Sequence, residues 1–278
     1  MGAATLALVT ACSSSPPAKS SSSAASAKSG TTSSSGSTAG VTPQKAITLA
    51  AAQTQQVNSL SGTMSVQIGS ATAVNGTIQV QVRPTLLIGD NLSASSSGQS
   101  TNISEILTST ALYMDVPGLS GATGQPWTEV PFSELSGSLG TALNQAVQEA
   151  ESGDPLTQTQ LLAVSKNVRE VGTQVINGVS TTEYSGSLSP SAALNALSPS
   201  LSKELAPELK MLSGDINFDV WLDSQHMVHK LVENETVNGQ AATVTVNVTS
   251  ENQPVTISVP SSSQVYVLPA SALSSGGL

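Results

Sequence analysis

Hydrophobic and polar residues alternate with a period of two along much of this chain. Such alternation is typical of β-strands with one buried face. Tight-turn pairs separate several of these segments, namely Asn75-Gly76, Asn177-Gly178, Asp223-Ser224 and Asn238-Gly239. The pattern predicts strands within residues 64–68, 78–82, 85–88, 91–95, 103–116, 127–130, 168–176, 179–188, 215–222, 227–237, 241–250, 255–259 and 265–268.

Three segments have helical spacing instead. Thr42 is a candidate N-cap and Pro43 the first helical residue of a helix that ends near Ser61-Gly62. A middle segment repeats leucine and valine at helical intervals, at Leu135, Leu139, Leu143 and Val147, and again at Leu156, Leu161, Leu162 and Val164. An insert between Pro190 and Leu212 does the same at Leu194, Leu197, Leu201, Leu205 and Leu209.

Short strands joined by tight turns pair antiparallel, because parallel pairs need helical crossovers. The amphipathic helices need an apolar surface to cover. We therefore predict the α+β class, with a strongly curved antiparallel sheet whose concave face is covered by helices. Residues 41–278 would form this single domain.

The N-terminus has a different character. A short apolar run from Ala3 to Ala11 ends at Cys12, the only cysteine, and polar sequence follows at once. This is the form of a bacterial lipobox, in which the cysteine carries lipid, although a chance cysteine in a disordered N-terminus is the alternative. No Lys or Arg precedes the run, so we expect residues 1–12 to be a truncated signal peptide. Residues 13–40 are rich in Ser, Ala, Gly and Thr and are expected to form a disordered tether.

Composition narrows the function further. Charged residues make up only 10% and the net charge is −9, which disfavours a nucleic-acid partner because phosphate binding needs clustered Lys and Arg. A single cysteine leaves no disulfide and no thiolate zinc site. A surface rich in uncharged polar residues fits an extracytoplasmic protein, anchored to the bacterial cell membrane through lipidated Cys12.

Catalytic chemistry is hard to assemble from this sequence. His226 and His229 are the only histidines, and we interpret them as exposed turn residues rather than metal ligands. Asp215, Asp219 and Asp223 could form an acidic stripe for a cation, but we expect them to line the solvent side of a strand. No G-x-S-x-G elbow occurs. We predict no enzyme activity, no metal and no cofactor.

Several strand and turn motifs recur through the predicted sheet. They are Tyr113-Met114-Asp115-Val116, Trp127, Val171-Gly172, Val175-Ile176-Asn177-Gly178-Val179, Thr182-Glu183-Tyr184-Ser185-Gly186, Trp221-Leu222-Asp223 and Val228-His229-Lys230. Together these motifs resemble the mycobacterial LppX/LprAFG lipoproteins. The resemblance implies a half-barrel similar to the LolA and LolB carriers, holding an acylated lipid or lipoglycan between sheet and helices for movement across the envelope, with an envelope transporter as a possible partner.

The leucine rows of the helical inserts have two interpretations. They either pack against the sheet as core, or line an apolar cavity for an acyl chain. The candidate cavity residues are Leu143, Val147, Leu194, Leu197 and Leu201. Two other functions stay open: an envelope protein-interaction or sensory module without an internal ligand, and an esterase acting on envelope lipids.

Overall fold

A computed structural model describes residues 41–70, 72–96, 98–117, 124–135, 165–196 and 209–269, with single residues 147, 199, 202, 203 and 206. The strands are β1 Ser59–Ile68, β2 Thr72–Gln81, β3 Leu87–Ser96, β4 Gln99–Thr108, β5 Ala111–Asp115, β6 Trp127–Pro131, β7 Lys166–Ile176, β8 Val179–Leu188, β9 Ile216–Leu222, β10 Val228–Val237, β11 Gln240–Glu251 and β12 Val265–Val267. The helices are α2 Pro43–Thr54, α5 Pro190–Ala196 and the 3₁₀ turns η2 Phe132–Glu134 and η3 Ser262–Gln264.

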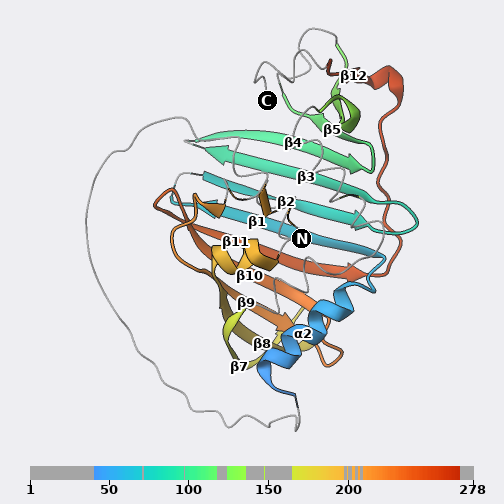
Figure 1. The fold of residues 1–278 in the computed structure, drawn as a ribbon. Coiled ribbons are helices and arrows are strands. Elements are labelled where there is room, and N and C mark those ends of the chain that lie inside the picture. The colour runs from blue at the N-terminus through green and yellow to red at the C-terminus, as the bar shows by residue number, and fades with distance from the viewer. Residues whose placement is uncertain are drawn as a thin grey trace.

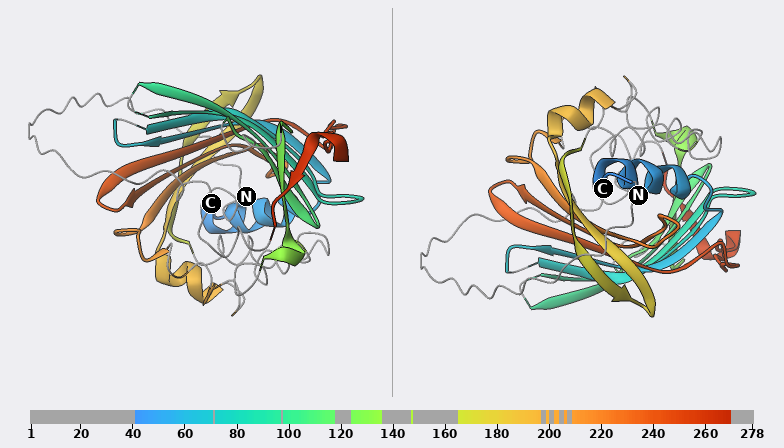
Figure 2. Two further views of the ribbon diagram at one scale, coloured as in Figure 1. Left: turned by 90° about the horizontal axis from the view of Figure 1, so that it is seen from above. Right: turned by 90° about the horizontal axis from the view of Figure 1, so that it is seen from below.

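The strands form one open sheet in the order β12-β6-β5-β4-β3-β2-β1-β11-β10-β9-β8-β7 (Figure 1). The sheet curves strongly, and α2 lies inside the curve (Figure 2). The predicted α+β class, with a helix on the concave face of a half-barrel, is therefore confirmed. In the part of the chain that the structure describes, no helix is long and apolar enough to cross a bilayer.

One strand pair breaks the predicted antiparallel rule. Residues 265–268 were expected to form an antiparallel strand, but β12 pairs in parallel with β6 at the far edge of the sheet. Residues 255–259 form no strand. Instead this extended segment crosses the outer face, where an added Cβ on Gly89 would lie 3.1 Å from Ile257. This connection from β11 carries the chain to the far edge of the sheet, where β12 runs parallel to β6.

The first helix begins as predicted and ends earlier. The Thr42 hydroxyl accepts a hydrogen bond from the Lys45 N–H at 3.3 Å, and Pro43 follows it. The helix stops at Thr54 rather than near Ser61-Gly62, because β1 already begins at Ser59. Gly62 instead lies inside β1, at a register shift against β11, where an added Cβ would lie 2.5 Å from the Asn247 carbonyl oxygen.

The Asn75-Gly76 pair is not a turn. Both residues lie inside β2, with Gly76 between Met64 of β1 and Leu92 of β3. A Cβ on Gly76 would collide with the carbonyl oxygen of Asn91 and lie 2.8 Å from a Leu92 methyl group. This glycine is therefore required for close approach of neighbouring strands, not for a reversal of the chain.

The remaining turns agree with the sequence. Asn177 and Gly178 have positive φ angles of 51° and 83° and join β7 to β8, and Asn238-Gly239 joins β10 to β11. β7 forms one edge of the sheet and carries two register shifts, between Lys166 and Arg169 and between Glu170 and Gly172.

The two faces of the sheet differ in chemistry. On the outer face, hydroxyl groups donate to asparagine side chains of neighbouring strands, as from Ser65 to Asn75 at 2.7 Å and from Ser104 to Asn91 at 3.0 Å. On the concave face, α2 packs its buried alanines and Ile47 against Phe218, Val220 and Leu222 of β9. The apolar core thus lies inside the curve.

Candidate ligand-binding face and polar recess

The centre of the concave face is an apolar surface whose buried residues come from three strands. The strand register places Met64 and Val66 of β1 beside Val246 and Val244 of β11, and Leu92 of β3 completes the cluster. All five side chains are at most 8% exposed. Strand alternation alone brings these residues to one face.

The predicted cavity residues are only partly covered by the described residues. Val147 is buried and packs with Leu86 and Phe132 at the β3–β5 end of the concave face. Leu194 is half-buried in α5. Leu143, Leu197 and Leu201, like Cys12, the predicted lipidation residue, lie outside the described residues.

Four carboxyl groups also occupy inward positions on this face, and the sequence analysis missed them. Asp90 of β3 pairs directly with Glu105 of β4. Glu233 and Glu235 of β10 pair with the inward residues Val244 and Ala242. The signal was present, because Asp90 lies between Ile88 and Leu92, and Glu105 between Ile103 and Leu107, in the alternating pattern.

Burial changes the acidity of these groups. Burial, together with the charge of Glu105, raises the pKa of Asp90 to about 7. Burial likewise raises the pKa of Glu105, Glu233 and Glu235, and Glu235 adds to the effect on Glu233. The Asp90 Oδ1 atom is buried without a hydrogen-bond partner. An inward carboxyl in this setting favours its neutral form.

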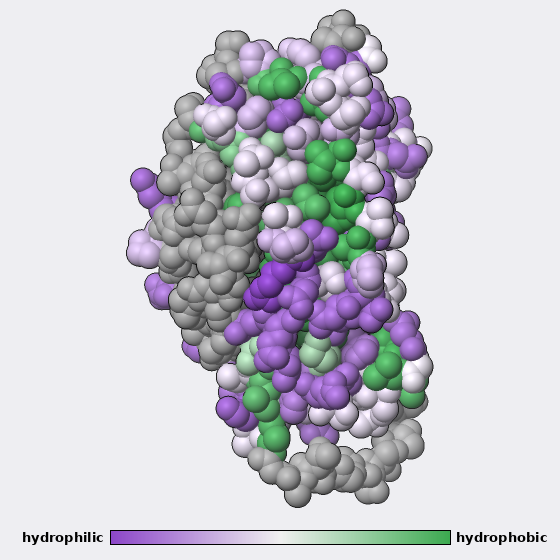
Figure 3. All heavy atoms as spheres, turned by 90° about the vertical axis from the view of Figure 1, so that its right-hand side faces the viewer, coloured by the Kyte–Doolittle hydropathy of each residue, from purple (hydrophilic) through white to green (hydrophobic). Residues whose placement is uncertain are grey.

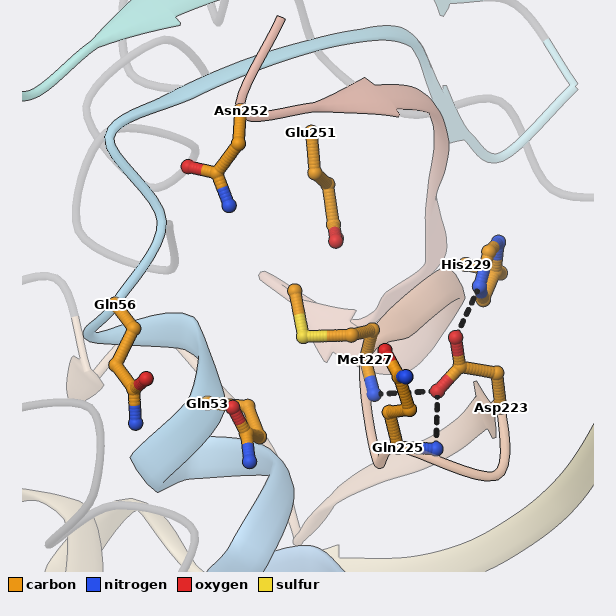
Figure 4. Close-up of a pocket in the computed structure, with 8 residues that line it drawn as sticks. All are labelled: Gln53, Gln56, Asp223, Gln225, Met227, His229, Glu251 and Asn252. Atoms are coloured by element: carbon orange, nitrogen blue, oxygen red, sulfur yellow. Dashed lines mark hydrogen bonds and ion pairs between the residues drawn. The ribbon is translucent and has the colours of Figure 1, made fainter.

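A polar recess of about 400 Å³ lies at the rim of the concave face (Figure 4). It is formed where the end of α2, the turn between β9 and β10, and the end of β11 meet. Its lining consists of four amides, two carboxyl groups, one imidazole and one thioether: Gln53, Gln56, Gln225, Asn252, Asp223, Glu251, His229 and Met227.

Asp223 organises the turn beside this recess. Its Oδ1 accepts hydrogen bonds from the backbone N–H groups of Gln225 and Met227 at 2.8 and 2.9 Å. Its Oδ2 lies 3.2 Å from Nε2 of His229. Burial alone would raise the pKa of Asp223, but these backbone N–H groups and the imidazole outweigh it and hold the pKa below its usual value.

The histidine and aspartate predictions were correct only in part. His229 belongs to β10 and its side chain is 18% exposed, so its assignment as an exposed turn residue was wrong. Asp219 points away from the concave face, opposite Ser185, as predicted, whereas Asp223 lines the recess. Among the described residues, no three His, Cys, Asp or Glu side chains gather in a way that could hold a metal ion.

Fold and site together define an open half-barrel α+β protein with an apolar concave face and a polar recess at its rim. Comparison with family models and with curated protein sequences finds no match. Solved structures do match. LprF from Mycobacterium bovis is 15% identical over 78% of this chain and 96% of its own, with a TM-score of 0.48.

LppX from Mycobacterium tuberculosis is 17% identical over 78% of this chain and 98% of its own, also with a TM-score of 0.48. The MucA/MucB complex of Pseudomonas aeruginosa matches at 12% identity over 80% of this chain and 59% of that one, with a TM-score of 0.35. LprF and LppX are lipoproteins of the kind that the sequence resembles, so the predicted resemblance is found again here.

Proposed function

We propose that this chain is a lipid-anchored protein of the bacterial cell envelope that binds the apolar part of a lipid or acylated molecule on its concave face. It carries or presents this molecule without changing it covalently. The observation that supports the proposal most directly is the apolar surface inside an open sheet, with Met64, Leu92 and Val246 at its centre. The lipobox at Cys12 supports the envelope location.

The energetics suit reversible binding. Each methylene that leaves water for an apolar surface gains about 0.8 kcal/mol, so a chain of about ten methylenes gains on the order of 8 kcal/mol before the cost of ordering it. Aliphatic residues dominate the surface, because aromatic residues make up only 3% of the chain. Flexible aliphatic walls can pack around an acyl chain, and the polar rim leaves the head group in water.

A carrier is favoured over an esterase by the composition of the recess. His229 and Asp223 are paired there, as a base and its orienting group would be in a hydrolase. The described lining has no serine, threonine, cysteine, lysine or tyrosine that could act as a nucleophile. The Asp223–His229 pair instead stabilises the turn between β9 and β10.

Native mass spectrometry tests the proposal. The full chain carrying Cys12→Ser is expressed in an actinobacterial host and weighed before and after solvent extraction. We expect an extractable mass that corresponds to an acylated molecule. A clean apo mass that is unchanged after incubation with envelope lipids contradicts the proposal and favours the protein-interaction module.

A matched pair of variants locates the bound molecule. Ile103 points inward beside the central cluster, whereas Asn102 lies next to it on the outer face and is exposed. We expect Ile103→Asn to reduce the retained mass severalfold and Asn102→Ala to leave it unchanged. Equal retention by both variants contradicts binding on the concave face.

A further inference from the structure

The recess at the rim has a charge that restricts what it can bind. Figure 3 views the molecule from the side on which α2 ends, where hydrophilic residues gather in the middle of the face and a hydrophobic patch lies above them. The described lining of the recess contains two carboxyl groups and no lysine or arginine. Arg83 does not line the recess. Its guanidinium group donates hydrogen bonds to Asn58 Oδ1 at 2.9 Å and to the Gln55 carbonyl oxygen at 3.5 Å. Phosphate or carboxylate groups would therefore meet two like-charged carboxyl groups in the described lining.

The two carboxyl groups have different roles. Both oxygens of Asp223 are already used, by two backbone N–H groups and by His229. The Glu251 side chain points into the recess in Figure 4, and the structure gives its carboxyl group no hydrogen bond or ion pair with a described residue. Burial raises the pKa of Glu251, with His229 opposing and Asp223 adding to this effect. Among the described residues, His229 is paired with Asp223, and the Glu251 carboxyl group has no ion-pair partner of its own.

The amide side chains around Glu251 supply complementary groups. Gln53 lies in the last turn of α2 and Gln56 just beyond its end, and both line the recess (Figure 4). Each offers a carbonyl oxygen that accepts and an NH₂ group that donates. A ligand that carries an ammonium group next to an oxygen atom would satisfy both. The described lining has no aromatic ring, so it lacks the cage that quaternary ammonium groups prefer.

We propose that this recess binds a primary ammonium group on the head of the carried amphiphile, as in an amino-alcohol lipid. Glu251 is its counter-ion, and the carbonyl oxygens of Gln53 and Gln56 accept its remaining N–H groups. This inference rests on the proposed function, because it assigns the head group of the molecule whose chain lies on the concave face. Glu251 pairs with Leu60, an inward residue of β1, so the recess opens beside the apolar surface.

Three amphiphiles with the same chain test the head group. Decylammonium, decyl sulfate and decanol are titrated below their micelle concentrations into the full chain carrying Cys12→Ser, at pH 7 and low salt, and binding is followed by calorimetry. We expect decylammonium to bind about tenfold more tightly than decanol, and decyl sulfate to bind more weakly than decanol. Salt should reduce only the differences among the three.

Variants show whether Glu251 is responsible. Glu251→Gln keeps the shape and removes the charge, so decylammonium should then bind no better than decanol. Glu134→Gln is the control, since Glu134 is exposed in η2 and does not line the recess. Gln53→Ala is a second, smaller perturbation that should weaken decylammonium binding severalfold. Circular dichroism confirms that each variant is folded.

The outcomes separate the two proposals. Equal binding of all three amphiphiles, unchanged by Glu251→Gln, overturns the ammonium assignment and leaves the carrier function intact. Binding of none of them overturns both. Free ethanolamine is titrated alongside, and if it binds as tightly as decylammonium, in a manner that needs Glu251, the recess takes a small amine and the head-group assignment is wrong.

Discussion

Asp90 provides the sharpest test of how the concave face is built. Its pKa lies at about 7 in the folded chain against an ordinary value of 3.8, with burial as the main cause and Glu105 as the second. Between these two values the folded chain holds a proton that the unfolded chain has released. The free energy of unfolding must therefore decrease as pH rises from about 4 to about 7, and this contribution stays absent above pH 7.

The size of the effect follows from the shift. A change of about three pKa units, at about 1.4 kcal/mol each, sets an upper limit of about 4 kcal/mol at pH 8. Asp90→Asn removes the titration and keeps the shape. We expect it to match the parent within about 1 kcal/mol at pH 4.5 and to be more stable by about 2–4 kcal/mol at pH 8.

Urea unfolding followed by the fluorescence of the two tryptophans, at pH 4.5, 6 and 8, measures these differences. Asp215→Asn is the control, because Asp215 is exposed and this variant keeps Asp90, so the decrease in stability that Asp90 causes should remain. Glu105→Gln removes a charge that raises the pKa of Asp90. In this variant the decrease in stability caused by Asp90 should therefore be complete at a lower pH. A constant difference between Asp90→Asn and the parent at all three pH values would refute the inward, buried placement of this carboxyl group.

Three further changes test the packing. Gly76→Ala should lower the free energy of unfolding by about 3 kcal/mol, because the new Cβ meets the neighbouring strand. The control Gly172→Ala, with nothing within 4 Å of the new Cβ, should change it by less than about 1 kcal/mol. Equal effects of the two changes in denaturant titrations would contradict the close approach of the strands. Phe218→Ala should cost about 3–5 kcal/mol by emptying the core beneath α2, and a thermal melt that shifts by only a degree or two would argue against that core. Asp223→Ala should cost about 1–2 kcal/mol near neutral pH, and less as pH falls and the parent's carboxylate is protonated; a pH-independent cost would contradict the role of its ionised form.

The strands and their faces could be predicted from the sequence because each depends on local alternation. The β7–β8 hairpin was predicted correctly, since Asn177 and Gly178 adopt the positive φ angles that their residue types favour. Asn75-Gly76 has the same composition and lies inside a strand. The conformation of Asn75-Gly76 depends on the neighbouring strand β3, which approaches too closely for any side chain at Gly76. No local sequence pattern contains that information.

The candidate site was harder to predict than the fold. The inward carboxyl groups are visible in the sequence as breaks in the alternation. Apolar residues next to them in the pattern, such as Leu92 and Ile103, nevertheless predict an ordinary apolar strand face. The recess joins residues nearly two hundred positions apart, as between Gln53 and Asn252, and depends on where α2 ends. The helix was predicted to end near Ser61-Gly62, but it ends at Thr54. With the predicted end, the recess could not be located from the sequence.

An open half-barrel has one more consequence, for its solubility. A sheet that does not close leaves edge strands whose free N–H and C=O groups could recruit the strands of other copies and begin aggregation. At one edge, β12 is only three residues long. At the other, β7 exposes Val171 and Val175 but is interrupted by its two register shifts. These irregularities make β7 a poor template for strand addition, which lets the sheet stay open without joining other sheets.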